Sequence, residues 1–342
     1  IDFCKIMSGY NVVVVGATGL VGETIISILE ERNFPVENMV PLASARSLGK
    51  EVSFREEKIP IVELQSFDFK GVDFCFFSAG ADVSSEFVPI ATKQGAIVID
   101  NTSCFRYEDD VPLVVPEVNP DALTSYTSRN IIANPNCSTI QLVVALAPIH
   151  KIAKIKRINV ATYQSASGAG RRSLELLNQQ IEASLNGSDG SWEQLYAFNV
   201  IPQIDEFQEN SFSKEEMKLV WETQKILNDY DLLINATAVR VPVKVGHAEA
   251  INIETEIGIT PDQVREILSQ SQGIKVIDDV SKSSYPTPRT HGDQTDDVFV
   301  GRIRKDHTLK NGINLWVVAD NIRKGGALNS IQIAEALIQS YI

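Results

Sequence analysis

The chain has few cysteines, and their spacing excludes a disulfide scaffold and a zinc domain. Its 342 residues include four cysteines, at positions 4, 75, 104 and 137, with no CxxC pair. Scattered thiols in so long a chain are typical of a protein that works in a reducing compartment. We therefore expect a cytoplasmic protein with free thiols and no bound metal.

A long apolar run and an excess of positive charge are also missing. No stretch reaches the roughly 20 apolar residues that a membrane-spanning helix needs, and the first eight residues lack the apolar core of a signal peptide. The formal net charge is −13, whereas nucleic-acid binders present a basic surface. We expect neither a membrane protein nor a nucleic-acid binder, although an anion can still bind locally because pocket charge and net charge are separate matters.

The N-terminal part of the sequence alternates strand-like and helix-like segments. Helical spacing of apolar residues occurs at 20–31, directly after the first strand-like run. The strand-like runs are short and apolar, and they lie at residues 11–15, 36–43, 72–77 and 96–99. This alternation is the pattern of a parallel α/β sheet.

The pattern changes after Cys137. Longer strand-like runs lie at residues 156–164, 236–243, 247–257 and 313–318, and helix-like segments at 172–185, 215–228 and 261–270. Long strands with helices on one side indicate an α+β unit whose sheet is exposed on one face. A final amphipathic helix at 327–342 should pack back on the first domain, because its apolar side chains need a surface to cover them.

Three glycines follow the first strand. Gly16, Gly19 and Gly22 lie in the segment GATGLVG, between a valine-rich strand and a helix. This arrangement lets a pyrophosphate approach the helix N-terminus closely, so it predicts a dinucleotide site. A tight strand–helix turn without a ligand is the simpler alternative.

The end of the second strand distinguishes NAD from NADP. Enzymes that bind NAD usually place an acidic residue here to hold the ribose 2′-hydroxyl. This chain has Ser44, Arg46 and Ser47 instead, and a guanidinium with two hydroxyls suits a 2′-phosphate. The residues therefore favour NADP; without a cofactor, Arg46 would be a solvated loop cation.

Cys137 lies in the segment NPNCST, just before an apolar, helix-like run at residues 140–149. At the first turn of a helix, the free N–H groups and the positive end of the dipole favour the thiolate over the thiol. A thiolate attacks carbonyl groups, whereas a neutral thiol hardly does. The segment predicts a nucleophile, with a buried helix residue as the alternative.

His247 and Gln164 are the candidate partners of this thiol. His247 lies at the start of a strand, where an imidazole can carry protons at neutral pH; a structural histidine is the alternative. Gln164 ends a strand before a run of small residues and can form hydrogen bonds without changing charge. We expect His150 to cap a helix C-terminus, and His291 and His307 to face solvent.

Six motifs occur in an order that resembles the bacterial aspartate-β-semialdehyde dehydrogenases. They are GATGLVG at 16–22, ASARS at 43–47, NPNCS at 134–138, QSASG at 164–168, RVPV at 240–243 and DNIRKG at 320–325. The resemblance implies an α/β protein and a homodimer. Its two parts would be a Rossmann-type NADP-binding domain (residues 1–133 plus 321–342) and an α+β catalytic and dimerisation domain (residues 134–320).

The resemblance also implies a reaction and a role for each residue. L-Aspartate 4-semialdehyde, phosphate and NADP⁺ would give L-4-aspartyl phosphate and NADPH reversibly, at the branch point toward lysine, threonine, methionine and isoleucine. Cys137 would be the nucleophile, His247 the acid/base, and Gln164 would orient the thioester. Substrate binding would involve Arg240 for the α-carboxylate, Glu215 or its neighbour Glu216 for the amino group, and Arg106 and Lys218 for phosphate. The cofactor would contact Gly16, Thr18, Gly19, Leu20, Val21, Gly22, Ser44, Arg46, Ser47, Ser167, Gly168 and Asn321.

Three other functions compete with this interpretation. An N-acetyl-γ-glutamyl-phosphate reductase would share the glycine turn, a cysteine and a histidine, but usually shows a Pro-Gly-Cys-Tyr context. A glyceraldehyde-3-phosphate dehydrogenase would show an acidic residue after the second strand and a Ser-Cys-Thr-Thr context, and this chain has neither. A non-catalytic NADP-binding regulator would explain the glycines but not the set Cys137, Gln164 and His247.

Overall fold

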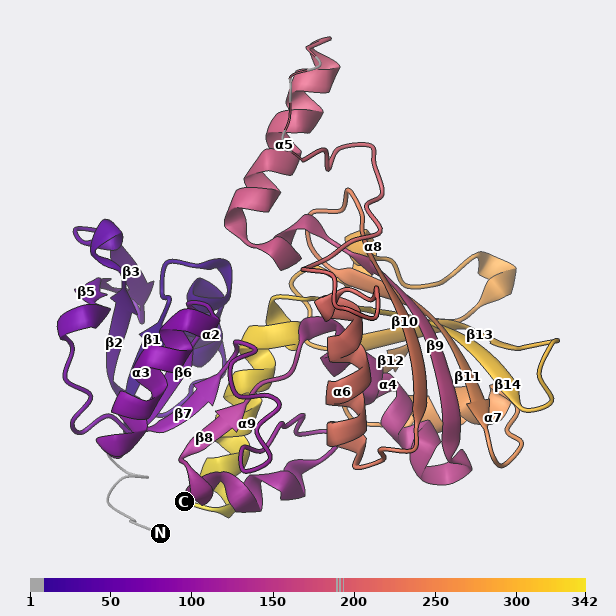
Figure 1. Cartoon of the computed structure of the whole chain (residues 1–342), viewed down its shortest axis with the longest axis horizontal. Coiled ribbons are helices and arrows are strands. Elements are labelled where there is room, and N and C mark those ends of the chain that lie inside the picture. Colours follow the sequence, from indigo (N-terminus) through magenta and orange to yellow (C-terminus); the bar gives the residue numbers. More distant parts are fainter. Residues whose placement is uncertain (1–8, 189, 191, 193) are drawn as a thin grey trace. The chain divides into compact units, whose positions relative to one another are not determined.

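The computed structural model describes residues 9–188, 190, 192 and 194–342 (Figure 1). The first eight residues, with Cys4 and the segment that we expect not to be a signal peptide, lie outside this range. The chain forms two compact units, which we call unit 1 (residues 1–136 and 326–342) and unit 2 (residues 137–325). None of the helices in the described part of the chain is both long and apolar enough to cross a membrane.

Unit 1 contains a six-stranded parallel sheet in the order β5-β2-β1-β6-β7-β8. The strands are β1 (Tyr10–Val15), β2 (Val36–Ala43), β5 (Val62–Glu63), β6 (Phe74–Phe77), β7 (Ile97–Asp100) and β8 (Ile131–Ala133). The helices are α2 (Leu20–Glu31), α3 (Ala81–Lys93) and α9 (Leu328–Ser340), and β3 (Glu51–Phe54) and β4 (Glu57–Pro60) form a separate hairpin. Valine-rich β1 is buried in the middle of the sheet. Strands that are covered on both faces have such continuous apolar sequences. The predicted parallel α/β sheet is confirmed.

The strand order positions the glycine turn. After β1 the chain runs to β2 and β5 on one side and then returns to β6 on the other side of β1. Open parallel sheets bind ligands at such a reversal, outside the carboxyl ends of the strands. Gly16 follows β1 at this point, and a Cβ on it would lie 2.9 Å from the Ser78 hydroxyl that follows β6.

The last helix belongs to unit 1, as the sequence predicts. Helix α9 contacts α2, and the Arg32 guanidinium donates two hydrogen bonds to the Glu335 carboxylate, at 2.8 and 2.7 Å. Ile331, Ala334 and Leu337 are buried in the core of unit 1. The chain therefore leaves unit 1 after β8 and returns to it at the C-terminus.

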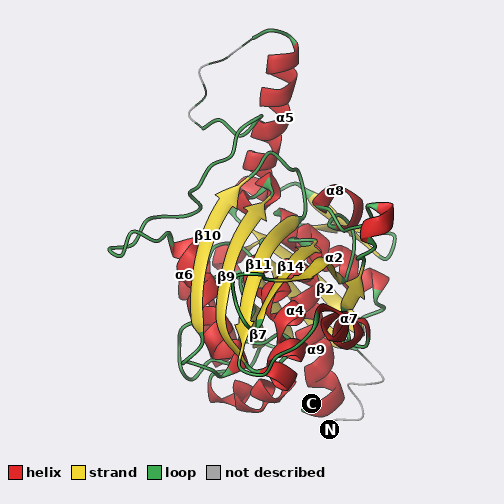
Figure 2. Ribbon diagram, turned by 90° about the vertical axis from the view of Figure 1, so that its right-hand side faces the viewer, coloured by secondary structure: helices red, strands yellow, loops and turns green. Residues whose placement is uncertain are grey.

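Unit 2 contains a six-stranded mixed sheet in the order β10-β9-β11-β14-β13-β12 (Figure 2). The strands are β9 (Ile155–Gln164), β10 (Leu233–Arg240), β11 (His247–Thr255), β12 (Ile274–Val276), β13 (Val298–Lys305) and β14 (Gly312–Ala319). The helices are α4 (Cys137–Ala153), α5 (Arg171–Leu185), α6 (Lys214–Leu227), α7 (Pro261–Ser269) and α8 (Pro288–His291). Along β9, buried residues alternate with exposed ones, so the predicted one-sided covering of the sheet is confirmed.

The sequence misplaced the bounds of one strand in unit 2 and missed the strands β12 and β13. The run predicted at 236–243 is β10 at Leu233–Arg240, and it ends early because Pro242 lacks the N–H that a further ladder bond needs. Strand β13 was missed altogether, since Arg302, Arg304 and Lys305 interrupt its apolar pattern.

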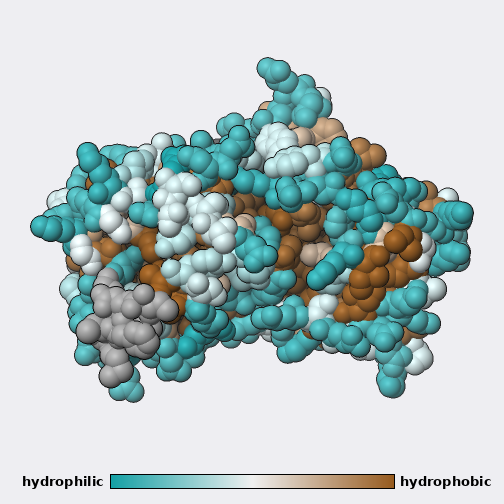
Figure 3. Space-filling model, turned by 90° about the horizontal axis from the view of Figure 1, so that it is seen from below, coloured by the Kyte–Doolittle hydropathy of each residue, from teal (hydrophilic) through white to brown (hydrophobic). Residues whose placement is uncertain are grey.

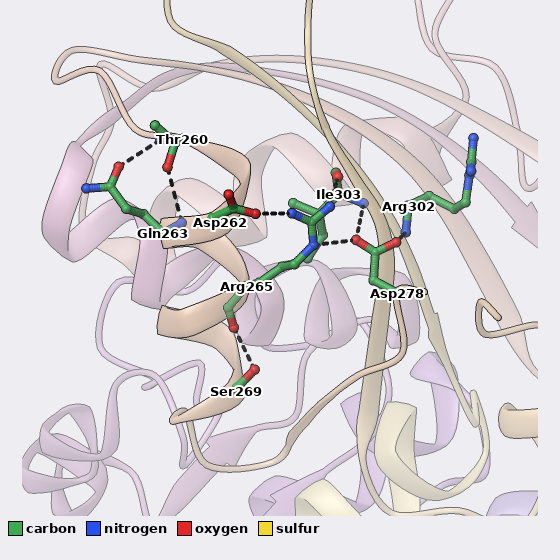
Figure 4. Close-up of polar contacts among 8 residues, drawn as sticks. All are labelled: Thr260, Asp262, Gln263, Arg265, Ser269, Asp278, Arg302 and Ile303. Carbon is green, nitrogen blue, oxygen red and sulfur yellow. Dashed lines mark hydrogen bonds and ion pairs between the residues drawn. The ribbon is translucent and has the colours of Figure 1, made fainter. Parts of the chain in front are cut away.

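The β13 strand also carries a bulge that α7 holds in place (Figure 4). Thr260 caps the start of α7, and Arg265 of this helix donates to the Asp278 carboxylate at 2.8 Å and to the Ile303 carbonyl at 2.6 Å. Asp278 accepts in turn from the backbone N–H of Arg302, whose φ of +54° marks the bulge. These bonds satisfy backbone groups that the shifted register leaves out of the ladder.

Charged and polar side chains cover most of the face drawn in Figure 3, and smaller apolar areas interrupt it. Exposed large apolar side chains of unit 2 include Leu185, Leu195, Phe198 and Val200, at the end of α5 and in the segment after it. Exposed apolar groups gathered in one segment are characteristic of contact surfaces.

Candidate active site

Cys137 is the first residue of α4, which confirms the predicted position at a helix start. The thiol is half-buried. A Cβ on Gly325 would lie 2.8 Å from the Cys137 Cβ, so the backbone of the DNIRKG motif packs directly on this residue. Asp320 shapes that motif, because its carboxylate accepts from the backbone N–H groups of Ile322 and Arg323. The helix start favours a thiolate at Cys137.

Gln164 links three elements of unit 2. It ends β9 and is 1% exposed. Its Nε2 donates to the Ser138 hydroxyl at 2.7 Å and to the Glu215 carboxylate at 3.0 Å. The side-chain amide is therefore oriented by the start of α4 on one side and the start of α6 on the other.

The structure separates the roles of the two neighbouring glutamates at the start of α6. Glu216 forms a capping box with Ser213 and also accepts from the Ala238 backbone N–H at 2.9 Å. Glu215 instead faces Gln164 and receives a hydrogen bond from the Lys218 ammonium at 2.9 Å. Glu216 thus has a structural role in starting the helix, and Glu215 belongs to the site.

Lys218 lies between two carboxylates. Its Nζ donates to Asp205 at 2.8 Å and to Glu215 at 2.9 Å, and the side chain is 11% exposed. Burial lowers the pKa of Lys218, but the two carboxylates outweigh burial and raise it above its ordinary value. The ammonium group stays charged across the physiological range.

Arg240 ends β10 and is buried, with its guanidinium donating to the Ser165 carbonyl at 2.8 Å. Burial lowers the pKa of Arg240, and the charges of Glu215 and Cys137 act in the opposite direction. Both groups therefore lie close enough to the guanidinium to affect its pKa.

His247 begins β11 and is fully buried. Its Nδ1 accepts a hydrogen bond from the Ser165 backbone N–H at 3.1 Å. A backbone N–H only donates, so the ring proton lies on Nε2, and Nε2 has no hydrogen-bond partner. Both Nε2 and Cε1 lie against Gly168, where a Cβ would be 3.0 and 2.9 Å away from them.

Burial and, to a smaller extent, the Arg240 charge lower the pKa of His247 to about 3, although Glu215 and the Gly246 backbone act in the opposite direction. The contact with Gly246 is weaker than the burial effect. The ring is therefore neutral at physiological pH and presents an N–H donor from Nε2.

Asn321 holds the loop around His247 together. Its Oδ1 accepts from Ser165 Oγ at 3.0 Å, from Ser167 Oγ at 3.2 Å and from the Gly246 backbone N–H at 2.8 Å. The amide thereby ties the turn after β9 to the residue before β11. Gly168 lies in the same turn.

Sheet topology brings these residues together. Gln164 is the register partner of Arg240 in the parallel pair β9–β10. In the antiparallel pair β9–β11, Ala248 faces Tyr163, so His247 lies beside Gln164 at the same end of the sheet. Central β9 thus joins the ends of β10 and β11, next to the start of α4.

Unit 1 contains most of the predicted cofactor residues, whereas Ser167, Gly168 and Asn321 lie in unit 2. Gly16 has a φ of +86°, and a Cβ on Gly22 would lie 2.2 Å from the Gly16 carbonyl oxygen, so the turn tolerates no side chain at 22. The hydroxyls of Thr18 and Ser47 lie 3.3 Å apart, which brings the glycine turn and the end of β2 together. Arg46 is exposed there. Ser44, Leu20 and Val21 occupy the same two segments.

Arg106 lies in unit 1, whereas Lys218 lies in unit 2. The Arg106 guanidinium is buried and donates to the Asn101 carbonyl at 2.8 Å. Burial raises the pKa of Asp100. Hydrogen bonds from Thr102 and Ser84 and the charge of Arg106 act in the opposite direction.

Of the other histidines and cysteines that the structure describes, His150, His291 and His307 lie in unit 2, and Cys75 and Cys104 lie in unit 1. His150 is in the last turn of α4, where its Nδ1 accepts from the Ile155 N–H at 3.3 Å. This bond joins the ring to the first residue of β9, whereas the predicted C-terminal cap would bond to a helix carbonyl. His291 was predicted in a solvent-facing loop, but it ends helix α8 and its ring packs against Phe299 at 5.2 Å. His307 is exposed. Cys75 is buried in β6.

Sequence reasoning missed Ser138, Ser165, Asp205 and Gly325, which contact the predicted residues. Ser138 and Ser165 each adjoin a predicted residue, and that adjacency was the available signal. Asp205 lies in a loop without a motif. Within the described residues, no group of three or more His, Cys, Asp or Glu side chains is arranged to hold a metal ion.

Comparison with protein families defines the class to which this fold and site belong. The model described as "Semialdehyde dehydrogenase, NAD binding domain" matches residues 11–126. The model described as "Semialdehyde dehydrogenase, dimerisation domain" matches residues 146–324. The chain is thus a semialdehyde dehydrogenase in architecture, with one family domain in each unit.

Individual relatives narrow the class. The aspartate-semialdehyde dehydrogenase of Legionella pneumophila is 52% identical over 335 residues, which cover 97% of this chain and 96% of that protein. The enzyme of the same name from Shewanella violacea is 54% identical, with 97% and 98% covered. The chain belongs to the aspartate-semialdehyde dehydrogenase family.

Solved structures agree with this assignment. The crystal structure of aspartate semialdehyde dehydrogenase II from Vibrio cholerae has a TM-score of 0.95 and 50% identity, covering 98% of this chain and 100% of that one. The same Vibrio enzyme has been solved in complex with ASA, with the same score. The Candida albicans enzyme, solved with NADP, is 27% identical with a TM-score of 0.75 and coverage of 97% and 99%.

Proposed function

We propose that the chain converts L-aspartate 4-semialdehyde, phosphate and NADP⁺ reversibly into L-4-aspartyl phosphate, NADPH and a proton. In the biosynthetic direction the acyl phosphate is reduced, and the product leads toward lysine, threonine, methionine and isoleucine. The observation that carries the proposal is the convergence of Cys137, Gln164, Arg240 and His247 in unit 2 of a chain from this family.

Cys137 carries the covalent chemistry. Its thiolate attacks the aldehyde carbon and forms a thiohemiacetal. NADP supplies the hydride acceptor when it is bound, and loss of hydride leaves a thioester on Cys137. Phosphate then attacks the thioester carbonyl and releases the acyl phosphate and the thiolate. Gln164 orients the acyl group through its fixed side-chain amide.

His247 handles the proton at the substrate oxygen. Its neutral ring holds a proton on Nε2, as the hydrogen bond to Nδ1 requires. That N–H is shared with the oxygen as negative charge develops there during thiolate attack, and it is recovered when the carbonyl forms again. Gly168 leaves room for the substrate oxygen beside Nε2 because it has no Cβ.

Charged residues recognise the ends of the substrate. Arg240 binds the α-carboxylate, since its guanidinium matches a carboxylate with two parallel hydrogen bonds. Glu215 binds the α-amino group, because Glu216 is engaged in the helix cap. Lys218 and Arg106 bind phosphate, and phosphate must draw the Lys218 ammonium from its contacts with Asp205 and Glu215.

Unit 1 fits the cofactor. The Gly16–Gly22 contact forms a turn that only glycine permits, and such a turn suits a pyrophosphate at the start of α2. Gly16, Thr18, Gly19, Leu20, Val21 and Gly22 would line it. Ser44, Arg46 and Ser47 would hold the 2′-phosphate, and Ser167, Gly168 and Asn321 of unit 2 the nicotinamide end. We assign NADP binding to residues 1–133 plus 321–342, and catalysis and dimerisation to 134–320.

The chain would act as a homodimer in the cytoplasm. The dimerisation-domain match covers unit 2, and that unit exposes Leu185, Leu195, Phe198 and Val200. A nucleophilic thiolate must stay reduced, which favours a reducing compartment.

One assay tests the substrate assignment. Aspartate semialdehyde and N-acetylglutamate semialdehyde are supplied side by side with phosphate and NADP⁺, and NADPH formation is followed. We expect kcat/KM for aspartate semialdehyde to be at least about 100-fold higher, because Glu215 needs a free amino group to pair with. Preference for the acetylated aldehyde would overturn the proposal.

A further inference from the structure

A second set of polar side chains lies one step deeper than the three central residues of the site. Gln141 follows Cys137 by one turn of α4, Thr162 precedes Gln164 by two residues in β9, and Glu249 follows His247 by two residues in β11. We call Gln141, Thr162 and Glu249 the polar layer. Residues at these spacings project from the same face of a helix or strand as their partners.

The sheet register places the layer together. Glu249 and Thr162 are direct register partners in the antiparallel pair β9–β11, and opposite side chains on one face are close neighbours. Helix α4 contacts both β9 and β11. Gln141 of this helix lies near enough to the Glu249 carboxyl to affect its pKa.

The layer is buried and polar, and burial of polar groups is costly. Glu249 and Thr162 are 0% exposed and Gln141 is 1% exposed. Neither carboxyl oxygen of Glu249, neither polar atom of the Gln141 amide, nor the Thr162 hydroxyl has a well-aligned hydrogen bond. Buried polar groups destabilise a fold unless hydrogen bonds satisfy them.

We propose that Glu249 is a positioning residue that, as an uncharged carboxylic acid, joins Gln141 and Thr162 beneath Cys137, Gln164 and His247. The acid proton is shared with the Gln141 amide oxygen, and the Thr162 hydroxyl donates to the carboxyl oxygen. These contacts fix the first turns of α4 against β9 and β11. The inference rests on the proposed function for its activity readout only.

Burial supports the uncharged form. It raises the pKa of the Glu249 carboxyl well above its usual range, and the Gln141 amide offsets only part of that rise. An ionised carboxylate in this place would need a cationic partner. An acid that keeps its proton can instead donate a hydrogen bond.

The test compares the native chain with four single variants and one double variant. Glu249→Gln keeps the shape and hydrogen-bonding capacity without a titratable group, whereas Glu249→Leu and Gln141→Leu remove polar contacts of the layer. Thr255→Val is the matched control, because it removes a buried hydroxyl that bonds to the Ile257 carbonyl at 2.8 Å at the other end of β11. The first readout is the rate of Cys137 alkylation by iodoacetamide without substrate, followed by mass spectrometry across pH. The second is kcat and KM.

We expect Glu249→Leu and Gln141→Leu to lower kcat about tenfold or more with KM changed less than about threefold, since substrate contacts remain. Cys137 alkylation should slow at least about threefold, because the thiol loses its fixed place beside the Arg240 charge. Glu249→Gln should stay within about threefold of the native chain in every readout, and Thr255→Val should lose only thermal stability. The double variant Glu249→Leu/Gln141→Leu should be no worse than the poorer single one.

Three results would overturn the proposal. The first is an alkylation rate and kcat in Glu249→Leu that equal those of the native chain. The second is an equal loss of kcat and alkylation rate in Glu249→Gln and Glu249→Leu. The third is a fall of more than about half a pH unit in the alkylation midpoint of Glu249→Gln, which would reveal an ionised carboxylate in the native chain. If Glu249→Leu does not fold, Gln141→Leu and Glu249→Gln decide the question. Alkylation needs no substrate, so it tests the positioning role separately from the proposed function. If the native chain oxidises neither aldehyde but the variants still change the alkylation rate, the proposed function is contradicted and the positioning role is supported.

Discussion

The two units build their sites from different materials. Unit 1 forms its candidate cofactor site from backbone and small side chains, around the contact between Gly16 and Gly22 and the neighbouring hydroxyls of Thr18 and Ser47. Unit 2 forms its site from buried ionisable side chains that come from separate elements of the fold: Glu215, Lys218, Arg240, His247 and Glu249. Backbone geometry is encoded locally, whereas a cluster of buried charges depends on the whole sheet.

This difference separates binding from chemistry. A glycine turn at a helix start can hold a phosphate without titrating, so its binding depends little on pH. A buried cluster of acids and bases changes pKa values and reactivity, which is what covalent chemistry needs. Variants in unit 2 should therefore change reaction steps, and variants in unit 1 should change cofactor binding.

The largest expected effect separates these two roles completely. Cys137→Ala should lower phosphate-dependent NADPH formation by at least about 10⁴-fold, because no other group can form the thioester. NADPH binding, measured by the quenching or transfer of fluorescence on titration, should stay within about twofold of the native chain. The control is Cys104→Ala, which removes a half-buried thiol of unit 1 and should keep turnover near native. Turnover retained in Cys137→Ala would contradict the assignment.

A second pair of variants breaks the comparison from the side of unit 1. Gly22→Ala places a Cβ 2.2 Å from the Gly16 carbonyl oxygen, whereas on Gly19 the same distance is 3.3 Å. We expect Gly22→Ala to weaken NADPH binding about 100-fold or more, and Gly19→Ala less than about tenfold, since only the first forces the turn apart. Cys137 alkylation should be native in both. Equal loss of binding in the two variants would show that the close approach does not matter.

The same contrast explains what the sequence could predict. The glycine turn, the valine-rich β1 and the helix start at Cys137 are contiguous patterns, so their local structure follows from short-range sterics and capping. The Ser44–Ser47 segment was likewise found because it directly follows a strand. Each of these features needs no knowledge of the strand order.

The active-site cluster could be predicted only through resemblance. Nothing local connects Gln164 with Glu215 or His247 with Ser165, because these contacts arise from the register of β9 with its neighbours. Glu249 breaks the sequence pattern, because an ionisable residue on the covered face of a strand contradicts the usual alternation. Gly325 was hidden as well, since its packing on Cys137 joins residues far apart in the chain.

A smaller effect sharpens the cofactor assignment. Arg46→Ala should lower kcat/KM for NADP⁺ about tenfold to 100-fold, because the contact between the guanidinium and the 2′-phosphate is lost. It should leave kcat/KM for NAD⁺ within about twofold, because NAD⁺ lacks that phosphate. Steady-state rates with both cofactors measure this. Lys50→Ala, an exposed cation just beyond the same segment, should leave both values unchanged. An equal fall for both cofactors would assign Arg46 a general role in binding.

The smallest expected effect concerns the buried acid of unit 2 and works through pH. Burial raises the pKa of the Glu249 carboxyl well above its usual range, with the Gln141 amide acting against it, so the folded chain keeps a proton that the unfolded chain releases above about pH 4.3. The free energy of unfolding therefore loses this contribution as pH rises above the unfolded value, by up to about 1.4 kcal/mol per pH unit. Glu249→Gln carries no such proton, so its stability relative to the native chain should increase by about 1 kcal/mol or more from pH 5 to pH 8.

Urea unfolding at pH 5, 6.5 and 8 measures this difference in stability. The opposite slope from neutral His247 cancels because both chains contain that ring. The exposed Glu256→Gln is the control for loss of a negative charge at the surface. If the stabilities of Glu249→Gln and the native chain change in parallel with pH, Glu249 is ionised in the folded chain. Glu249 would then not belong to the buried cluster with shifted pKa values that distinguishes unit 2 from the backbone site of unit 1.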